Sequence, residues 1–212
     1  MQRFVAAATL QLLVPSVATR YLSVLLFDQR LEDAVLTGLV PLVCAVATSS
    51  LVSSALMLRC HHDRQWLLRA HLSAGLRGLI VGAMAFHVTL VLFGAPVVDL
   101  WPQTLLLAVL LSSLTTMPLA LHLTWAPQKW RTLLLELRVT TVLELYLVCS
   151  SIGAALGAYV GAFPIPLDWD RPWQQWPLTC VYGTLLGQAA GILTSMVLAA
   201  TSPSIAKLTK TE

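Results

Sequence analysis

Six stretches of this sequence are apolar for long enough to cross a lipid bilayer as helices. The hydrocarbon core of a bilayer needs about 20 consecutive apolar residues per helix, and these stretches reach that length with few or no charges. The composition agrees, because 57% of the 212 residues are hydrophobic, 11% are charged and the mean hydropathy is +0.77, unlike a soluble domain. We therefore predict an all-α polytopic membrane protein: a single transmembrane domain over 1–212, a bundle of six transmembrane helices with short loops. The predicted spans are 4–27, 34–58, 78–98, 101–123, 139–163 and 178–200.

The first span has a competing interpretation as a cleavable signal peptide. The segment "MQRFVAAATLQLLVPSVA" has a basic first turn, an apolar run and an ending of small residues, as signal peptides do. The apolar pattern resumes after Arg20 and continues to Phe27, which makes the whole stretch long enough to span. We favour the span, and cleavage would leave the predicted orientation of the other helices unchanged.

The distribution of lysine and arginine predicts that both termini are cytosolic. With six spans, the termini and the connections 59–71 and 123–138 share one side of the membrane, and positive residues favour the cytosolic side. The opposite side, facing the lumen or the cell exterior, holds the acidic residues of the short connections with only Arg30 and Arg171. The positive residues of the predicted cytosolic side are Arg3, Arg59, Arg64, Arg69, Arg77, Lys129, Arg131, Arg138, Lys207 and Lys210.

Two ionisable residues are predicted to lie within the bilayer. His87 falls near the middle of the third predicted span, and Glu144 falls about six residues, or roughly 9 Å, inside the fifth. Such groups are costly in lipid and usually face the bundle interior or another protein, so both are candidates for binding a partner or a lipid. Structural alternatives remain, namely a hydrogen bond from His87 to a neighbouring helix and an ion pair between Glu144 and a nearby basic residue.

The last two predicted spans share a pattern of small residues. Each carries glycines at a spacing of four, which places them on one face of the helix and allows two helix backbones to approach closely. Because the spans are antiparallel across a short loop, we expect the glycines to meet in the pairs 161 with 183, 157 with 187, and 153 with 191. The candidate packing residues are Gly153, Gly157, Gly161, Gly183, Gly187 and Gly191.

The loop between these two spans reads "FPIPLDWDRPWQQWP" (163–177). Its prolines forbid a continuous helix and stiffen the connection, so the loop is predicted to cap a tight helical hairpin. Its tryptophans are explained most simply as an aromatic belt at the membrane surface, with ligand stacking as the alternative. The charged residues can pair with one another or bind a partner. The candidate binding residues here are Asp168, Trp169, Asp170, Arg171 and Trp173.

The sequence contains no motif that is typical of a catalytic site, a metal site or a cofactor site. The sequence has no Gly-x-Ser-x-Gly elbow and no glycine-rich phosphate loop. His61, His62 and Asp63 are adjacent in a basic connection without a partner cluster, so we interpret them as solvated residues and not as metal ligands. The cysteines are dispersed without Cys-x-x-Cys spacing. We expect no catalytic residue, no metal, no cofactor and no nucleic-acid partner.

Two segments of the sequence resemble a known family. "FHVTLVLFGAPVVDL" (86–100) and "GAYVGAFPIPLDWDRPWQQWP" (157–177), followed by "GTLLGQAAG", closely resemble the PIG-F family of glycosylphosphatidylinositol (GPI) anchor assembly. The resemblance is strong over 86–100 and 140–191, moderate through the fourth span and weak before about Gly75. The Pro-Ile-Pro-Leu-Asp-Trp-Asp-Arg-Pro-Trp run (164–173), in which the seventh position is an acidic residue, is highly specific.

The resemblance implies a multi-pass protein of the endoplasmic reticulum membrane that is not itself the catalyst. Members of this family accompany and stabilise the ethanolamine phosphate transferases called PIG-O and PIG-G, which add ethanolamine phosphate to GPI mannoses in the lumen. His87, Glu144, Gly157, Gly161 and 164–173 fall on family motif positions, without an implied catalytic role. The leading hypothesis is therefore an accessory subunit that contacts membrane lipids and a PIG-O-like or PIG-G-like transferase. The alternatives are a subunit that handles phosphatidylethanolamine directly through Glu144 or the loop aspartates, and a channel or transporter.

Overall fold

The computed structural model confirms an all-helical chain. Within the described residues there is no strand, and six helices are long and apolar enough to cross a membrane. The described residues are 2–28, 30–57, 64–124, 126–167, 169 and 171–201. Their helical elements are α1 (Gln2–Val17), η1 (Ala18–Leu22), α2 (Ser23–Phe27), α3 (Val35–Met57), α4 (Arg64–Leu92), α5 (Trp101–Leu114), α6 (Thr116–Leu123), α7 (Pro127–Leu134), α8 (Val142–Ala162), η2 (Pro172–Gln174) and α9 (Leu178–Thr201).

The third span differs most from its prediction. The sequence predicts 78–98, whereas the apolar segment is Arg69–Leu92 within the longer helix α4. The prediction started too late because it treated the basic residues before Gly78 as a loop, although a helix can carry such residues at its exposed end. It also ended too late, because the chain leaves the helix near Gly94, which has a φ of +96°. The other spans begin and end within three residues of their predicted limits.

Two spans are not regular α-helices throughout. The first consists of α1, the π-helical turn η1 and α2, so one turn in the second half of the span is wider than an α-helix. The fourth consists of α5 and α6, which are separated at Thr115. Pro118 explains this break, since proline lacks the N–H that would bond to the carbonyl of Leu114 one turn earlier.

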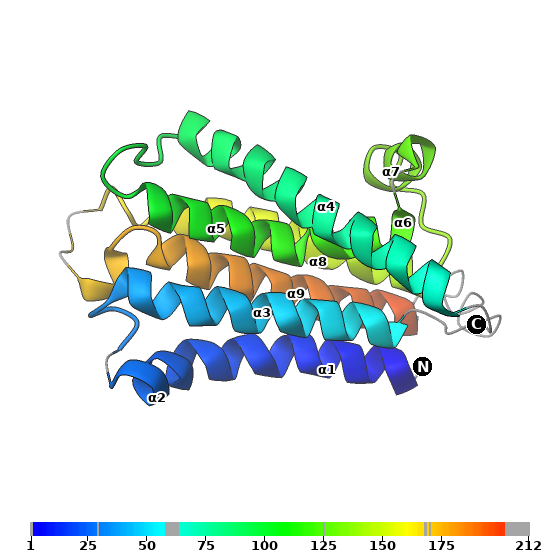
Figure 1. The fold of residues 1–212 in the computed structure, drawn as a ribbon, viewed down its shortest axis with the longest axis horizontal. Coiled ribbons are helices and arrows are strands. Elements are labelled where there is room, and N and C mark those ends of the chain that lie inside the picture. The colour runs from blue at the N-terminus through cyan, green and yellow to red at the C-terminus, as the bar shows by residue number, and fades with distance from the viewer. Residues whose placement is uncertain are drawn as a thin grey trace.

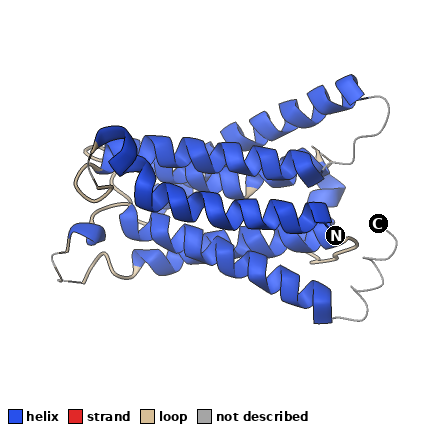
Figure 2. Cartoon of the chain, turned by 90° about the horizontal axis from the view of Figure 1, so that it is seen from below, coloured by secondary structure: helices blue, strands red, loops and turns tan. Residues whose placement is uncertain are grey.

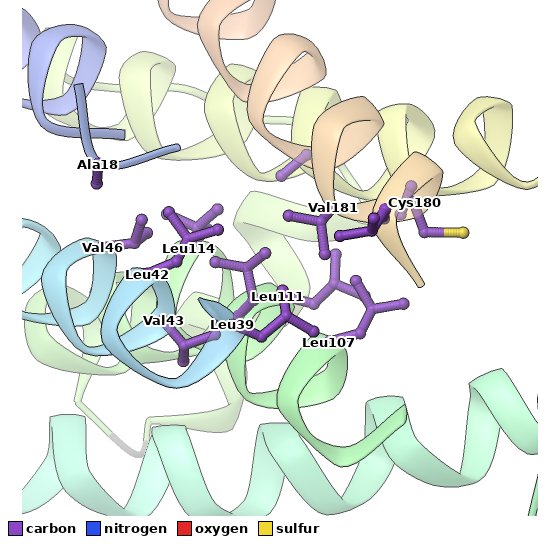
Figure 3. Packing of buried hydrophobic residues seen from close by; sticks show 14 of the residues in the cluster. Ala18, Leu39, Leu42, Val43, Val46, Leu107, Leu111, Leu114, Cys180 and Val181 are labelled. Carbon is purple, nitrogen blue, oxygen red and sulfur yellow. The ribbon is translucent and has the colours of Figure 1, made fainter. Parts of the chain in front are cut away.

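The fourth span forms the centre of the bundle. Its apolar window is 78% buried, against 22–50% for the other spans. It packs against α4 on one side and α3 on the other, and it also touches α8 and α9 (Figures 1 and 2). The main core cluster lies around it, with leucine and valine side chains of α3 and α5 meeting Val181 of α9 (Figure 3). The outer surface is apolar too, as expected for helices that contact lipid.

The helices run along one axis, so the molecule has two ends (Figure 1). α1 begins and α9 finishes at one end, where the short helix α7 also lies. The connections 28–34, 93–100 and 163–177 lie together at the opposite end. The end that carries the loop 163–177 is called the loop end below.

Candidate functional site

The loop 163–177 is folded around the side chain of Gln174. The Nε2 group of Gln174 donates a hydrogen bond to the carbonyl of Pro164 at 2.6 Å and to that of Ile165 at 3.3 Å, and it also contacts the carbonyl of Leu167. The side-chain amide of Gln174 therefore ties the second part of the loop to backbone carbonyls of its first part. The proline-rich sequence supplies few N–H donors of its own, so this side chain holds the loop closed.

Trp176 connects the loop to a neighbouring span. Its Nε1 donates a hydrogen bond to Oγ1 of Thr104 at 3.0 Å, and that hydroxyl is shared with the carbonyls of Pro96 and Leu100, each at 3.1 Å. The loop 163–177, the start of α5 and the connection 93–100 are thereby joined at the loop end. The two segments that carry the family resemblance are consequently linked through the buried Thr104.

The loop's outer surface presents aromatic and basic side chains. Trp169 and Trp173 stack edge to face with ring centroids 5.8 Å apart, and Trp169 is 54% exposed. Arg171 is exposed beside them. Asp168 and Asp170, which were also predicted to belong to this site, lie outside the described residues. In the part of the loop that is described, Trp169 and Arg171 are thus exposed and Trp173 is half-buried.

Beneath the loop, glycines bring the backbones of α8 and α9 into direct contact. A Cβ atom on Gly157 would overlap the carbonyl oxygen of Gly183 and lie 2.9 Å from the Cα of Gly187. A Cβ atom on Gly183 would lie 3.0 Å from the Cα of Gly161, and one on Gly153 would lie 3.2 Å from the Cα of Gly191. The glycines interdigitate along the whole contact, so each one lies close to two residues of the facing helix. These two helices share the most extensive contact among the described elements.

Glu144 lies at a helix start, which corrects its predicted depth in the membrane. α8 begins at Val142 and not at 139, so Glu144 is the third residue of its first turn. Its Oε2 accepts hydrogen bonds from the backbone N–H groups of Thr140 and Thr141, at 2.7 and 3.2 Å, and Oγ1 of Thr141 accepts one from the N–H of Glu144 at 3.1 Å. This reciprocal arrangement is a capping box. We therefore assign Glu144 a structural role.

His87 lies in α4 and is half-buried. Its ring is partly buried, and its Nδ1 atom has no hydrogen-bond partner among the described residues. The alternative of a hydrogen bond to a neighbouring helix is therefore not realised through this atom. A buried nitrogen without a partner is unusual, but because this atom is covered it cannot itself contact another molecule, and the role of His87 in binding a partner or a lipid stays a prediction.

One known protein family matches most of this chain. The family described as GPI biosynthesis protein family Pig-F matches residues 11–196, which is most of the sequence. The chain belongs to the PIG-F family. The match includes the first two spans, where the sequence resemblance to PIG-F is weak.

Several curated relatives carry names from the same pathway. A human protein named "GPI ethanolamine phosphate transferase, stabilizing subunit" is 40% identical over 116 residues, which is 55% of this chain and 53% of that protein. A Schizosaccharomyces pombe "PIGF/3-ketodihydrosphingosine reductase fusion protein" is 35% identical over 147 residues, 69% of this chain and 29% of that protein. A Yarrowia lipolytica "Glycosylphosphatidylinositol anchor biosynthesis protein 11" is 37% identical over 123 residues, 58% of this chain and 53% of that protein. The chain thus spans about half the length of the human and Yarrowia lipolytica proteins, and no solved structure matches it.

Within this PIG-F bundle, sequence reasoning missed a buried polar connection between three spans. Gln11 of α1 donates a hydrogen bond to Oγ of Ser53 in α3 at 2.8 Å, and Gln188 of α9 donates to Oε1 of Gln11 at 3.3 Å. All three side chains are buried. Glutamines inside apolar spans were the available signal, because polar side chains in lipid normally hydrogen-bond across helices.

A second glycine contact in the PIG-F bundle was also missed. A Cβ atom on Gly78 of α4 would lie 2.5 Å from the Cβ of Ala120 and 2.9 Å from the carbonyl of Thr116 in α6. Gly82, one turn further along α4, packs on Ser112 and Thr116 in the same way. The spacing of four that identified the contact between α8 and α9 was present here as well. It was overlooked although both glycines lie inside the predicted third span, because two glycines make a shorter pattern than the three on each of α8 and α9.

Proposed function

We propose that this chain is a non-catalytic subunit that stabilises a GPI ethanolamine phosphate transferase. The observation that carries the proposal is the family match over 11–196, together with relatives named as the stabilising subunit of that enzyme. The geometry of the loop end is consistent with it. A loop that rests on tightly packed helices, exposes Trp169 and Arg171 and holds the half-buried Trp173 against Trp169 has the composition of a protein-binding surface.

The finer parts of the proposal concern the partner and the place. We propose that the partner is a PIG-O-like or PIG-G-like transferase and that the complex lies in the endoplasmic reticulum membrane. Docking would use the loop end together with the exposed side of the outer helix α4, where His87 lies. The positive-inside rule supports a lumenal loop end and cytosolic termini. On this arrangement the loop 163–177 would lie on the side of the membrane where the transferase acts.

Removing this protein from cells should lower the amount of its transferase, because a membrane subunit that loses its partner exposes an unpaired surface and is degraded. Affinity purification in mild detergent, followed by mass spectrometry, should recover the transferase with the intact chain. The purified chain alone should neither hydrolyse nor transfer ethanolamine phosphate. Sustained turnover by the pure chain, or an unchanged transferase level in its absence, would overturn the accessory role.

The orientation predicts which connection can be glycosylated. An N-glycosylation acceptor on a flexible insertion after Leu167 should be modified in the lumen, whereas the same insertion in the connection 58–63 should not. The insertion after Leu167 leaves Gln174 in place, so the bundle should still assemble. A mass shift that is sensitive to endoglycosidase measures the outcome. Modification of the 58–63 insertion alone would mean that the protein has the opposite orientation.

A further inference from the structure

A second polar site lies at the loop end, on the side of the first span. A cavity of about 710 Å³ opens between the first span, the connection 28–34 and the start of α9. Its wall includes Arg20 from the π-helical turn η1, Arg30 and Glu32 from the connection, and Tyr182 from α9. This volume is within the range of sites that hold small molecules or cofactors. The alternative to a binding site is a water-filled gap between charged surface residues.

The charges of this cavity do not neutralise one another. Within the part of the chain that the structure describes, Arg20, Arg30 and Glu32 form no ion pair. At the other end of the molecule, by contrast, Glu136 lies 3.7 Å from Arg131 and 3.5 Å from Arg138. The cavity therefore offers two guanidinium groups and one carboxylate to a ligand.

The position of Arg20 adds a second observation. An arginine within a membrane span is costly unless it reaches water, a lipid headgroup or a partner. Arg20 lies seven residues before the end of the span at Phe27, which is roughly 10 Å at the helical rise, so its long side chain can reach the headgroup region. The turn that carries it is π-helical, a local widening that occurs often at functional sites.

We propose that this cavity binds the headgroup of a zwitterionic phospholipid. The phosphodiester would accept hydrogen bonds from Arg20 and Arg30, because the planar guanidinium fork matches phosphate oxygens. The ammonium group would lie against the carboxylate of Glu32 and the rings of Tyr21 and Tyr182, which also line the cavity. Exposed apolar side chains of the first span, such as Val17 and Val24, would then contact the acyl chains.

Glu32 makes the proposed site selective. The primary ammonium of an ethanolamine headgroup can donate hydrogen bonds to a carboxylate, whereas the quaternary ammonium of choline cannot. A glycerol headgroup carries no positive charge and would leave Glu32 unpaired. The expected order of binding is therefore phosphatidylethanolamine, then phosphatidylcholine, then phosphatidylglycerol. This site does not depend on the proposed stabilising role, since it can bind lipid whether or not a transferase is present.

The experiment supplies the full chain in mild detergent with equal amounts of the three phospholipids and counts the bound lipid by native mass spectrometry. Arg20→Gln combined with Arg30→Gln should weaken retention of phosphatidylethanolamine at least about tenfold, because two charge-assisted hydrogen-bonding groups are lost. Glu32→Gln should retain phosphatidylglycerol as well as it retains phosphatidylethanolamine. Lys129→Gln is the matched control, since it removes an exposed positive charge at the opposite end and should leave lipid retention unchanged.

Three results would overturn the proposal. One is equal retention of the three lipids by the unmodified chain, and another is retention of phosphatidylethanolamine by the Arg20 and Arg30 double variant at the level of the Lys129→Gln control. The third is soluble phosphoethanolamine displacing the lipid at equal concentration, which would identify a free metabolite as the ligand. If the double variant does not fold, Arg30→Gln and Glu32→Gln, both in a connection outside the helices, carry the test alone.

Discussion

Replacing Gly157 or Gly187 with leucine will separate α8 from α9 and destabilise the whole protein. The added Cβ atom of either variant meets backbone of the facing helix, which cannot move aside as a side chain can. Overpacking of cores typically costs about 1–3 kcal/mol, and a contact between two backbones should lie at or above the upper limit. Because the loop 163–177 begins and ends on these two helices, it would lose its shape together with the pair.

Matched controls are available on the same helices. Ala155 of α8 and Ala190 of α9 are exposed, so Ala155→Leu and Ala190→Leu add the same kind of bulk toward lipid. The amount of monodisperse protein that remains in detergent after a heat challenge, measured by size-exclusion chromatography, should fall for the glycine variants and stay near normal for the alanine variants. Equal behaviour of the two sets would mean that the glycine contact does not hold the hairpin together.

The fold was largely predictable because a bilayer limits the choice of structure. Apolar runs of the right length can form only helices in lipid, so the six spans followed from composition and length. The failure at the third span has the same origin. Basic residues such as Arg69 and Arg77 interrupt the apolar run without ending the helix, and hydropathy alone does not distinguish these two cases.

Residues of the candidate site could be predicted from the sequence only where a spacing pattern indicates one kind of contact. Glycines at a spacing of four indicate close packing of two helices, and in the structure they lie along the contact between α8 and α9. Gln174 has no such pattern, because its partners are backbone carbonyls whose positions depend on how the loop is folded. Glu144 was placed too deep for a related reason. The sequence marks Thr141 and Glu144 as a capping box only when the helix start is known.

A substitution of Arg171 tests the outer surface of the loop without changing the hydrogen bonds that close the loop. Arg171→Ala leaves the hydrogen bonds of Gln174 in place and removes a side chain suited to a carboxylate or phosphate of a partner. If Arg171 docks the transferase, this variant should keep its own abundance and recover less transferase. GPI precursors that lack the later ethanolamine phosphates should then accumulate. If Arg171 only pairs within the loop at the membrane surface, the pair contributes about 0–1 kcal/mol and both measurements stay normal.

Gln174→Glu should have the larger effect on docking, because it reverses the interaction that closes the loop. The substitution replaces the amide donor by a carboxylate of nearly the same shape, which then faces the carbonyls of Pro164, Ile165 and Leu167. Leaving such polar groups without partners costs about 1–3 kcal/mol. The helices beneath the loop do not use this side chain, so the variant should keep its abundance and its elution profile.

Gln175→Glu is the matched control for this variant, since it makes the same change of charge at the next residue, which is exposed and belongs to the same loop. A loss of about 1.4 kcal/mol in the complex weakens binding about tenfold, so affinity purification should recover much less transferase with Gln174→Glu than with Gln175→Glu. Because the two variants have the same net charge, a difference between them reports the shape of the loop. Equal recovery from both, with normal abundance, would show that the partner binds elsewhere, and the exposed side of α4 around His87 would then be the surface to change next.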